Sequence, residues 1–98
     1  MADRLRIDKW LWHARFFKTR GLAADLVLAG RLRRNGARLT KPGKQVGPGD
    51  TLTFPQGDRI RVVRVIAVGT RRGPSAEAEA LYLDLAPPEE TAADLRLE

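Results

Sequence analysis

The spacing of apolar residues changes along the chain and divides it into a helical first part and a strand-rich second part. Apolar side chains recur at helical spacing over residues 9–17 and again over residues 21–29. From residue 31 onward, short extended segments alternate with turns rich in Gly, Pro and Asn. The pattern predicts an α+β fold with two short N-terminal helices packed on a small, mainly antiparallel sheet of about four to five strands.

The first helix is expected over residues 9–17, with Asp8 as its N-cap. One face should build the core and carries Trp10, Leu11, Ala14 and Phe17. The other face mixes aromatic and basic groups: Lys9, Trp12, Arg15 and Phe16. Its aromatic rings have two interpretations, a binding surface or coverage by the rest of the chain.

The second helix is expected over residues 21–29, with Thr19 as N-cap and Gly30 in the left-handed position that ends it. Lys18 and Arg20 flank its start, where the positive end of the helix dipole makes a cation unfavourable. An anion would offset this, so backbone amides, the Thr19 hydroxyl and the two cations predict a phosphate clamp. The alternative is that solvent screens the charges and nothing binds.

Asn35-Gly36 predicts a hairpin turn between two short strands, with Arg33 and Arg34 just before it. Turns should fill residues 41–50, and strands should follow at residues 51–54 and 59–68. The break in alternation at Val62-Val63 indicates either a bulge or burial on both faces. A loop is expected over residues 69–80, then a last strand that ends before Pro87-Pro88.

Charge is distributed unevenly along the 98 residues, whose net charge is +6. Residues 1–72 hold 17 Lys and Arg against five acids, an excess of +12, whereas residues 73–98 carry −6. This favours a polyanionic partner for the first part, although composition bias with solvated arginines is an alternative. We expect one domain over residues 1–88 (core motif 4–54, strand extension 55–88) and an acidic tail, 89–98, that is either truncated or ends in a cloning scar.

Composition alone argues against several classes of site. The absence of Cys excludes disulfides and thiolate metal sites, and a single histidine, His13, cannot build a zinc site with others of its kind. We expect no cofactor. No apolar run reaches the length of a membrane span, and the first residues lack the apolar core of a secretory signal, so we expect a cytoplasmic protein without a membrane partner.

The order of helix, helix, hairpin, Gly-Asp turn and strand resembles the alpha-L motif, the RNA-binding domain first defined in ribosomal protein S-four. The matching positions are Arg6-Ile7-Asp8, Leu11, Lys18-Thr19-Arg20, Ala23, Gly30, Asn35-Gly36 and Gly49-Asp50. The aromatic-rich run DKWLWHARFFKTR, followed by Asn-Gly, Lys-Pro and the loop RRGPS, is similar to the heat shock protein 15 family of ribosome-associated proteins. Two departures stand out. Arg34 replaces an apolar residue before Asn-Gly, and the chain ends in acids where the family tends to have a helix and a basic tail.

The resemblance implies binding to ribosomal RNA of the large ribosomal subunit, and help in recycling subunits that retain peptidyl-tRNA under heat stress. Peptidyl-tRNA is then a further candidate partner, and a monomer is expected. The RNA-facing residues that the resemblance implies are Arg6, Lys9, Arg15, Lys18, Thr19, Arg20, Arg33, Arg34 and Asn35. Arginine suits phosphate because its guanidinium binds two oxygens at once, although Asn35 has the alternative role of a turn residue with positive φ.

Three other functions remain open on the sequence. This domain also occurs as the RNA-binding accessory part of RNA-modifying enzymes, but an enzyme would need a catalytic group, and no nucleophile lies near a base here, so we expect no enzyme. A DNA-binding module would need base-reading side chains, and Asp25 is the only polar side chain in residues 21–29. A protein-interaction domain would use Trp10 and Trp12 as anchors, which the arginine excess disfavours.

Overall fold

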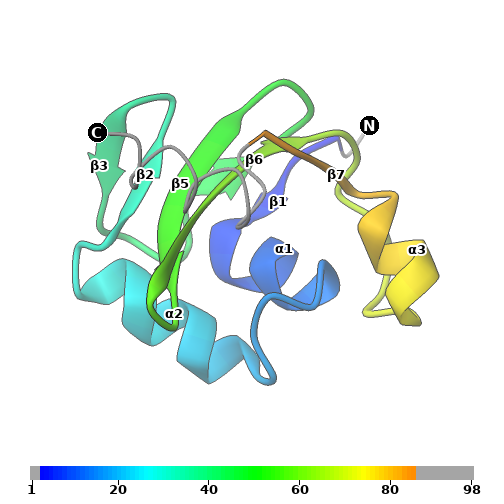
Figure 1. The fold of residues 1–98 in the computed structure, drawn as a ribbon, viewed down its shortest axis with the longest axis horizontal. Helices are drawn as coiled ribbons and strands as arrows, with labels where there is room; N and C mark the ends of the chain where they lie inside the picture. The colour runs from blue at the N-terminus through cyan, green and yellow to red at the C-terminus, as the bar shows by residue number, and fades with distance from the viewer. Residues whose placement is uncertain (1–2, 86–98) are drawn as a thin grey trace, which may run out of the picture.

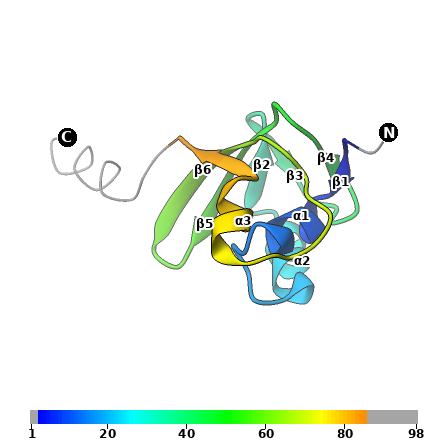
Figure 2. The same ribbon diagram turned by 90° about the vertical axis from the view of Figure 1, so that its right-hand side faces the viewer.

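The computed structural model describes residues 3–85, in which a five-stranded sheet has helices α1 and α2 on one face and α3 beside its last strand (Figures 1 and 2). The elements in chain order are β1 (Leu5–Arg6), α1 (Ile7–His13), α2 (Arg20–Leu28), β2 (Leu32–Arg34), β3 (Ala37–Leu39), β4 (Gln45–Val46), β5 (Thr51–Gln56), β6 (Arg59–Val65), α3 (Ser75–Glu79) and β7 (Tyr82–Asp84). The expected tail at residues 89–98 lies outside the described residues.

The main sheet is antiparallel throughout, with strand order β3-β2-β5-β6-β7. A separate two-stranded sheet pairs β1 with β4, and it places the residues before α1 against the turn-rich segment 41–50. The α+β prediction is therefore confirmed. The β1–β4 pair was not predicted, because two-residue strands leave no periodic pattern in the sequence.

The start and the end of α1 both differ from the expectation. The helix begins at Ile7, whose backbone amide donates to Lys44 O at 2.7 Å. A carbonyl of the segment 41–50 therefore satisfies the helix start, and the Asp8 side chain does not act as the N-cap. It ends at His13, since Arg15 N donates to Trp12 O and Phe16 N to Leu11 O. These two bonds form a Schellman motif with Arg15 at φ +67°.

The early end of α1 turns Phe16 into the core, which corrects its expected place on the opposite face. Its side chain is buried, and its ring packs edge-on against Phe54 with centroids 5.2 Å apart. Phe17, expected in the core, is only partly buried. The assignment of residues to helix faces assumes a continuous helix. It does not apply after residue 15, where the chain reverses direction.

Helix α2 and the hairpin follow the predicted local chemistry. Thr19 caps α2 by accepting a hydrogen bond from Leu22 N at 3.1 Å, and Gly30 closes the helix at φ +73°. Asn35 and Gly36 both have positive φ, +53° and +87°, as a two-residue type I′ turn requires.

The second half of the chain departs from the expectation twice. Strand β6 pairs with β5 in regular register through Val62 and Val63, without a bulge; Val63 is buried and Val62 half-buried. The expected loop at residues 69–80 contains α3 at Ser75–Glu79, because alternating Ala and Glu are good helix formers immediately after the extended Pro74. Strand β7 was predicted, and it pairs with β6.

The core lies between the main sheet and the helices. Its largest fully buried side chains are Trp10, Phe54, Ile7, Leu11, Leu32, Leu52, His13, Val27, Val46, Val63 and Val65. Two polar atoms in this set find carbonyl partners after β6, because Trp10 Nε1 donates to Ala67 O at 2.9 Å and His13 Nδ1 lies 3.1 Å from Val68 O. Helix α1 is thereby fixed against the chain that leaves the sheet.

Candidate nucleic-acid interface

Strand β4 brings the predicted hairpin residues and the start of the chain to one place. Gln45 O accepts hydrogen bonds from Arg4 Nη2 at 3.1 Å and from Arg34 Nη1 at 2.8 Å. Arg6 lies opposite Gln45 in the β1–β4 register. Residues 4 and 34, distant in sequence, thus present their guanidinium groups side by side.

Asp8 holds two further arginines at the start of the helices. Asp8 is 4% exposed, and its carboxylate accepts two hydrogen bonds from Arg6, from Nε at 3.1 Å and from Nη2 at 3.0 Å. Arg20 Nη2 lies 3.8 Å from the same carboxylate. The hydrogen bond to Asp8, with its charge, raises the pKa of Arg6 further above its already high ordinary value. Asp8 therefore positions two cations at the N-terminal ends of α1 and α2.

Asp50 has the same role on the hairpin side. Burial opposes its ionisation, but hydrogen bonds from Asn35 and the Gly47 amide, with the charges of Arg4 and Arg34, outweigh that cost and lower its pKa. The Gly47 amide donates to Asp50 Oδ2 at 2.9 Å, and Arg4 Nη2 lies 3.7 Å from this oxygen. The carboxylate thus stays charged and orders the groups around it.

We call the resulting surface the arginine cluster, which consists of Arg4, Arg6, Arg20 and Arg34. Its four guanidinium charges face the two carboxylates of Asp8 and Asp50, so a positive excess remains. Arg4, Arg6 and Arg20 keep about half of their side-chain surface exposed, at 52%, 51% and 42%. The cluster can therefore accept phosphate oxygens with guanidinium groups that are already oriented.

Arg4 was not among the predicted site residues, because nothing near Met1 marks a two-residue strand. Two lysines that the sequence analysis also left out, Lys41 and Lys44, are exposed on the loop that leads into β4. Their positive charge is visible in the sequence, but only the β1–β4 pairing shows that it lies near the other site residues.

The amide of Asn35 is fully engaged within the fold. Its Nδ2 donates to Asp50 Oδ1 at 3.0 Å, and its Oδ1 accepts from Thr51 N at 2.8 Å. Its backbone amide also donates to Thr51 O at 2.7 Å. These contacts favour the structural role of Asn35 over direct reading of a base.

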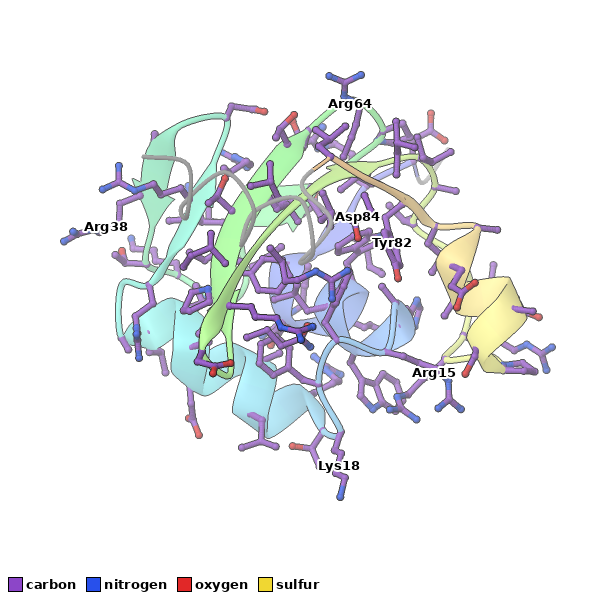
Figure 3. The ribbon with its side chains drawn as sticks, in the orientation of Figure 1. Arg15, Lys18, Arg38, Arg64, Tyr82 and Asp84 are labelled. Atoms are coloured by element: carbon purple, nitrogen blue, oxygen red, sulfur yellow. The ribbon has the colours of Figure 1, made fainter. Side chains whose placement is uncertain are left out.

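The other residues at the helix starts lie near the cluster and outside its contacts. Thr19 uses its hydroxyl oxygen to cap α2, and Lys18 extends away from the fold in the loop between α1 and α2 (Figure 3). Lys9 is half-buried on α1. Within residues 3–85 neither lysine forms a hydrogen bond or ion pair, so both charges are available to a ligand.

Two predicted residues are placed elsewhere. Arg33 alternates with Arg34 along β2, so it lies on the sheet face opposite the helices, where it pairs in register with Arg38. Arg15 follows the C-terminal end of α1, and its Nε donates to Gly73 O at 2.6 Å. The predicted set therefore forms three separate surfaces, and the arginine cluster is the one in which cations gather from four segments.

Residues 3–85 contain no group of three or more His, Asp or Glu side chains placed to hold a metal ion. Across the same residues, no helix has the length and apolarity needed to span a membrane. The chemistry that the described surface offers is that of guanidinium, ammonium and hydrogen-bonding groups.

The S4 domain family matches residues 5–52, which contain every described member of the arginine cluster except Arg4. Heat shock protein 15 of Escherichia coli is 46% identical over 85 residues, which are 87% of this chain and 63% of that protein. The chain thus spans less than two thirds of the length of this relative.

Two further comparisons extend the range of relatives. The RQC P-site tRNA stabilizing factor of Listeria monocytogenes is 35% identical over 65 residues, 66% of this chain and 70% of that protein. A trimeric structure of Vibrio cholerae heat shock protein 15 superposes with a TM-score of 0.84 at 36% identity, covering 97% of this chain and 99% of that one. The sequence analysis expects a monomer, and this stays a prediction for the present chain, although the structure of this relative is trimeric.

Proposed function

Because this chain belongs to the heat shock protein 15 family, we propose that it binds ribosomal RNA of the large ribosomal subunit through the arginine cluster. The observation that carries the proposal is the convergence of four guanidinium groups from β1, α2, β2 and the residue before β1, within a surface that holds two carboxylates. Such a surface binds a folded phosphate backbone by shape and charge, without reading base edges as its main source of affinity.

Lys18 and the capped start of α2 extend this surface. Arg20 is the first residue of α2 and Lys18 precedes it by two positions, so a phosphate at this helix start would offset the helix dipole and the like charges. Thr19 fixes the helix start through its hydrogen bond to Leu22 N. This segment is the part of the interface that the sequence pattern predicted most directly.

The finer role rests on the relatives. We propose that the chain assists the recycling of stalled large subunits that carry peptidyl-tRNA under heat stress. Relatives named for heat shock and for stabilizing P-site tRNA support a place near ribosome-bound tRNA. This role needs no catalytic step, since binding alone can favour one state of a subunit over another.

A DNA-binding role fits the described helices less well. Beyond Arg20, whose guanidinium lies 3.8 Å from Asp8, the side chains that α2 exposes are Leu22 and Leu28, which are 51% and 64% exposed, and Asp25. None of these pairs with a base edge in the way that Arg, Asn or Gln does. A competition between duplex DNA and structured RNA is expected to favour RNA.

Sedimentation and quantitative binding together test the proposal. In a sucrose gradient of a lysate, the protein should migrate with the large subunit, and nuclease treatment should release it. With a purified large-subunit RNA fragment, Arg20→Ala should raise Kd about tenfold, as expected for loss of a charged hydrogen bond. Arg59→Ala removes the same charge from the start of β6, at the opposite end of β5 and β6 from Thr51, and is the matched control.

Two outcomes would contradict the proposal. Comparable losses in Arg20→Ala and Arg59→Ala would show that binding depends on net charge alone and that the arginine cluster is not the site. Migration of the protein with the small subunit, or with neither subunit, would overturn the ribosomal assignment even where the purified RNA still binds.

A further inference from the structure

A cavity of about 190 Å³ lies between the end of α1, helix α3 and strands β5, β6 and β7. The residues that line it include Arg15, Phe16, Gln56, Ser75, Glu79 and Tyr82. Most of its wall comes from residues beyond position 52, outside the segment that matches the S4 domain. The arginine cluster lies at the opposite end of α1, so the cavity is a separate surface.

One wall of the cavity contains two aromatic rings. The rings of Phe16 and Tyr82 have centroids 4.7 Å apart and are tilted by 47°. Two alanines, Ala14 and Ala78, complete this part of the wall without filling the space. Phe16 is buried and Arg61 Cζ lies over its ring, 5.1 Å from the centroid, so the half-buried ring of Tyr82 is the aromatic surface open to a ligand. Accessible aromatic rings are the usual platforms for unpaired nucleobases.

The polar groups of the cavity divide into engaged and free ones. Gln56 is engaged, because its Nε2 donates to Phe16 O at 2.6 Å and its Oε1 accepts from Arg61 Nη1 at 2.8 Å. Within residues 3–85, the hydroxyls of Ser75 and Tyr82 and the carboxylate of Glu79 form no hydrogen bond or ion pair. Three free groups, able to donate and accept, thus line the cavity beside Gln56 and Arg61, whose side chains bond to each other.

Arg15 contributes a positive charge to the cavity, and its backbone has the strained, positive φ of +67°. Helices α1 and α2 end in the same Schellman motif, in which Gly30 occupies the left-handed position of α2 and Arg15 that of α1. A side chain at this position costs about 1 kcal/mol relative to glycine, and strain of this kind concentrates at functional sites. Arg15 Nε is fixed to Gly73 O, while its terminal nitrogens have no partner within residues 3–85.

We propose that this cavity binds one unpaired nucleotide of the RNA, with its base against Tyr82 and its phosphate on Arg15. Ser75 and Glu79 would hydrogen-bond the edge of the base, since a carboxylate accepts from the N–H groups that bases present there. The inference rests on the proposed RNA-binding function, and it adds a second contact beside the arginine cluster.

Two RNA hairpins of identical stem sequence, one with a single bulged nucleotide and one without, test the cavity. Wild type should bind the bulged hairpin about tenfold more tightly, within the range that stacking of one base on an aromatic group supplies. Ser75→Trp places a large ring at the cavity and should abolish this preference while leaving the affinity for the plain hairpin unchanged. Ala76→Trp is the matched control, since Ala76 is the next residue of α3, is exposed and does not line the cavity.

The outcomes separate the two proposals. Equal binding of both hairpins by wild type overturns the cavity and leaves RNA binding intact. Equal loss of preference in Ser75→Trp and Ala76→Trp also overturns it, since the effect would then not depend on the cavity. Failure of wild type to bind either hairpin or ribosomal RNA would contradict the proposed function itself. Circular dichroism melts of all three proteins verify that the variants fold.

Discussion

Asn35 and Asp50 are joined by a 3.0 Å hydrogen bond from Asn35 Nδ2 to Asp50 Oδ1, which ties the tip of the β2–β3 hairpin to the residue before β5. The same carboxylate accepts from the Gly47 amide, so one side chain orders the hairpin and the turn that leads into the sheet. Asn35 supplies both the positive φ of the turn and this tertiary contact. A residue of this kind serves the interface by holding Arg34 in place.

The role of Asn35 can be separated from its backbone conformation. Asn35→Gly keeps the positive φ and removes the contacts to Asp50 and Thr51, so it should lower the free energy of unfolding by about 1–3 kcal/mol, for two hydrogen bonds. Urea denaturation measures the change. In a double-mutant cycle with Asp50→Ala, the two effects should be less than additive. Additive effects would show that the 3.0 Å contact contributes nothing.

The lowered pKa of Asp50 predicts acid sensitivity. The pKa of this carboxyl group is lower in the folded than in the unfolded protein, where it is about 3.9. Such a group stabilises the fold at pH values above the unfolded-state pKa and loses that contribution as the pH falls through the folded-state pKa. The free energy of unfolding of wild type should therefore decline below about pH 4. Asp50→Asn should be less stable near neutral pH and should lack this component of the decline. Parallel curves for the two proteins would contradict the assignment.

Leu11 is expected to be a main contributor to the packing of α1. Its side chain is fully buried between α1 and α2, so Leu11→Ala should lower the free energy of unfolding by about 2–5 kcal/mol. The same substitution at Leu28, which is 64% exposed on α2, is the control and should change it little. Thermal melts compare the two variants. Equal effects would show that α1 is packed differently.

Local chemistry made part of this fold predictable. The residue type itself predicts the helix cap at Thr19, the helix end at Gly30 and the turn at Asn35-Gly36. The structure confirms all three. The end of α1 carries no such signal, because an arginine occupies the left-handed position where glycine is usual. The errors about the end of the first helix follow from that one residue.

The site was less predictable than the fold for a different reason. The arginine cluster depends on β1 and β4, whose two-residue pairing is a long-range event without local periodicity. Sequence reasoning therefore found Arg6, Arg20 and Arg34 as separate residues, missed Arg4, and grouped Arg33 with neighbours that point to the other face of the sheet.

Substitutions at Arg15 should separate stability from binding. Arg15→Ala and Arg15→Gly both remove the guanidinium and its bond to Gly73 O, but only glycine relieves the positive φ. Arg15→Gly should therefore be more stable than Arg15→Ala by about 1 kcal/mol. Both should lose the preference for a bulged RNA hairpin to a similar extent. If the more stable variant retained that preference, Arg15 would act on the fold and not on RNA.

Salt dependence tests whether phosphate contacts dominate binding. The four arginines of the cluster and Lys18 could neutralise about five phosphates, which predicts a slope of log K against log salt of roughly −3.5 to −4.5. Arg20→Ala should make the slope less steep by about one, because one counterion fewer is released on binding. Arg59→Ala should leave the slope unchanged, since Arg59 lies outside the cluster. A slope near zero for wild type would contradict the charge-based mechanism, because affinity would then come from contacts that release no counterions.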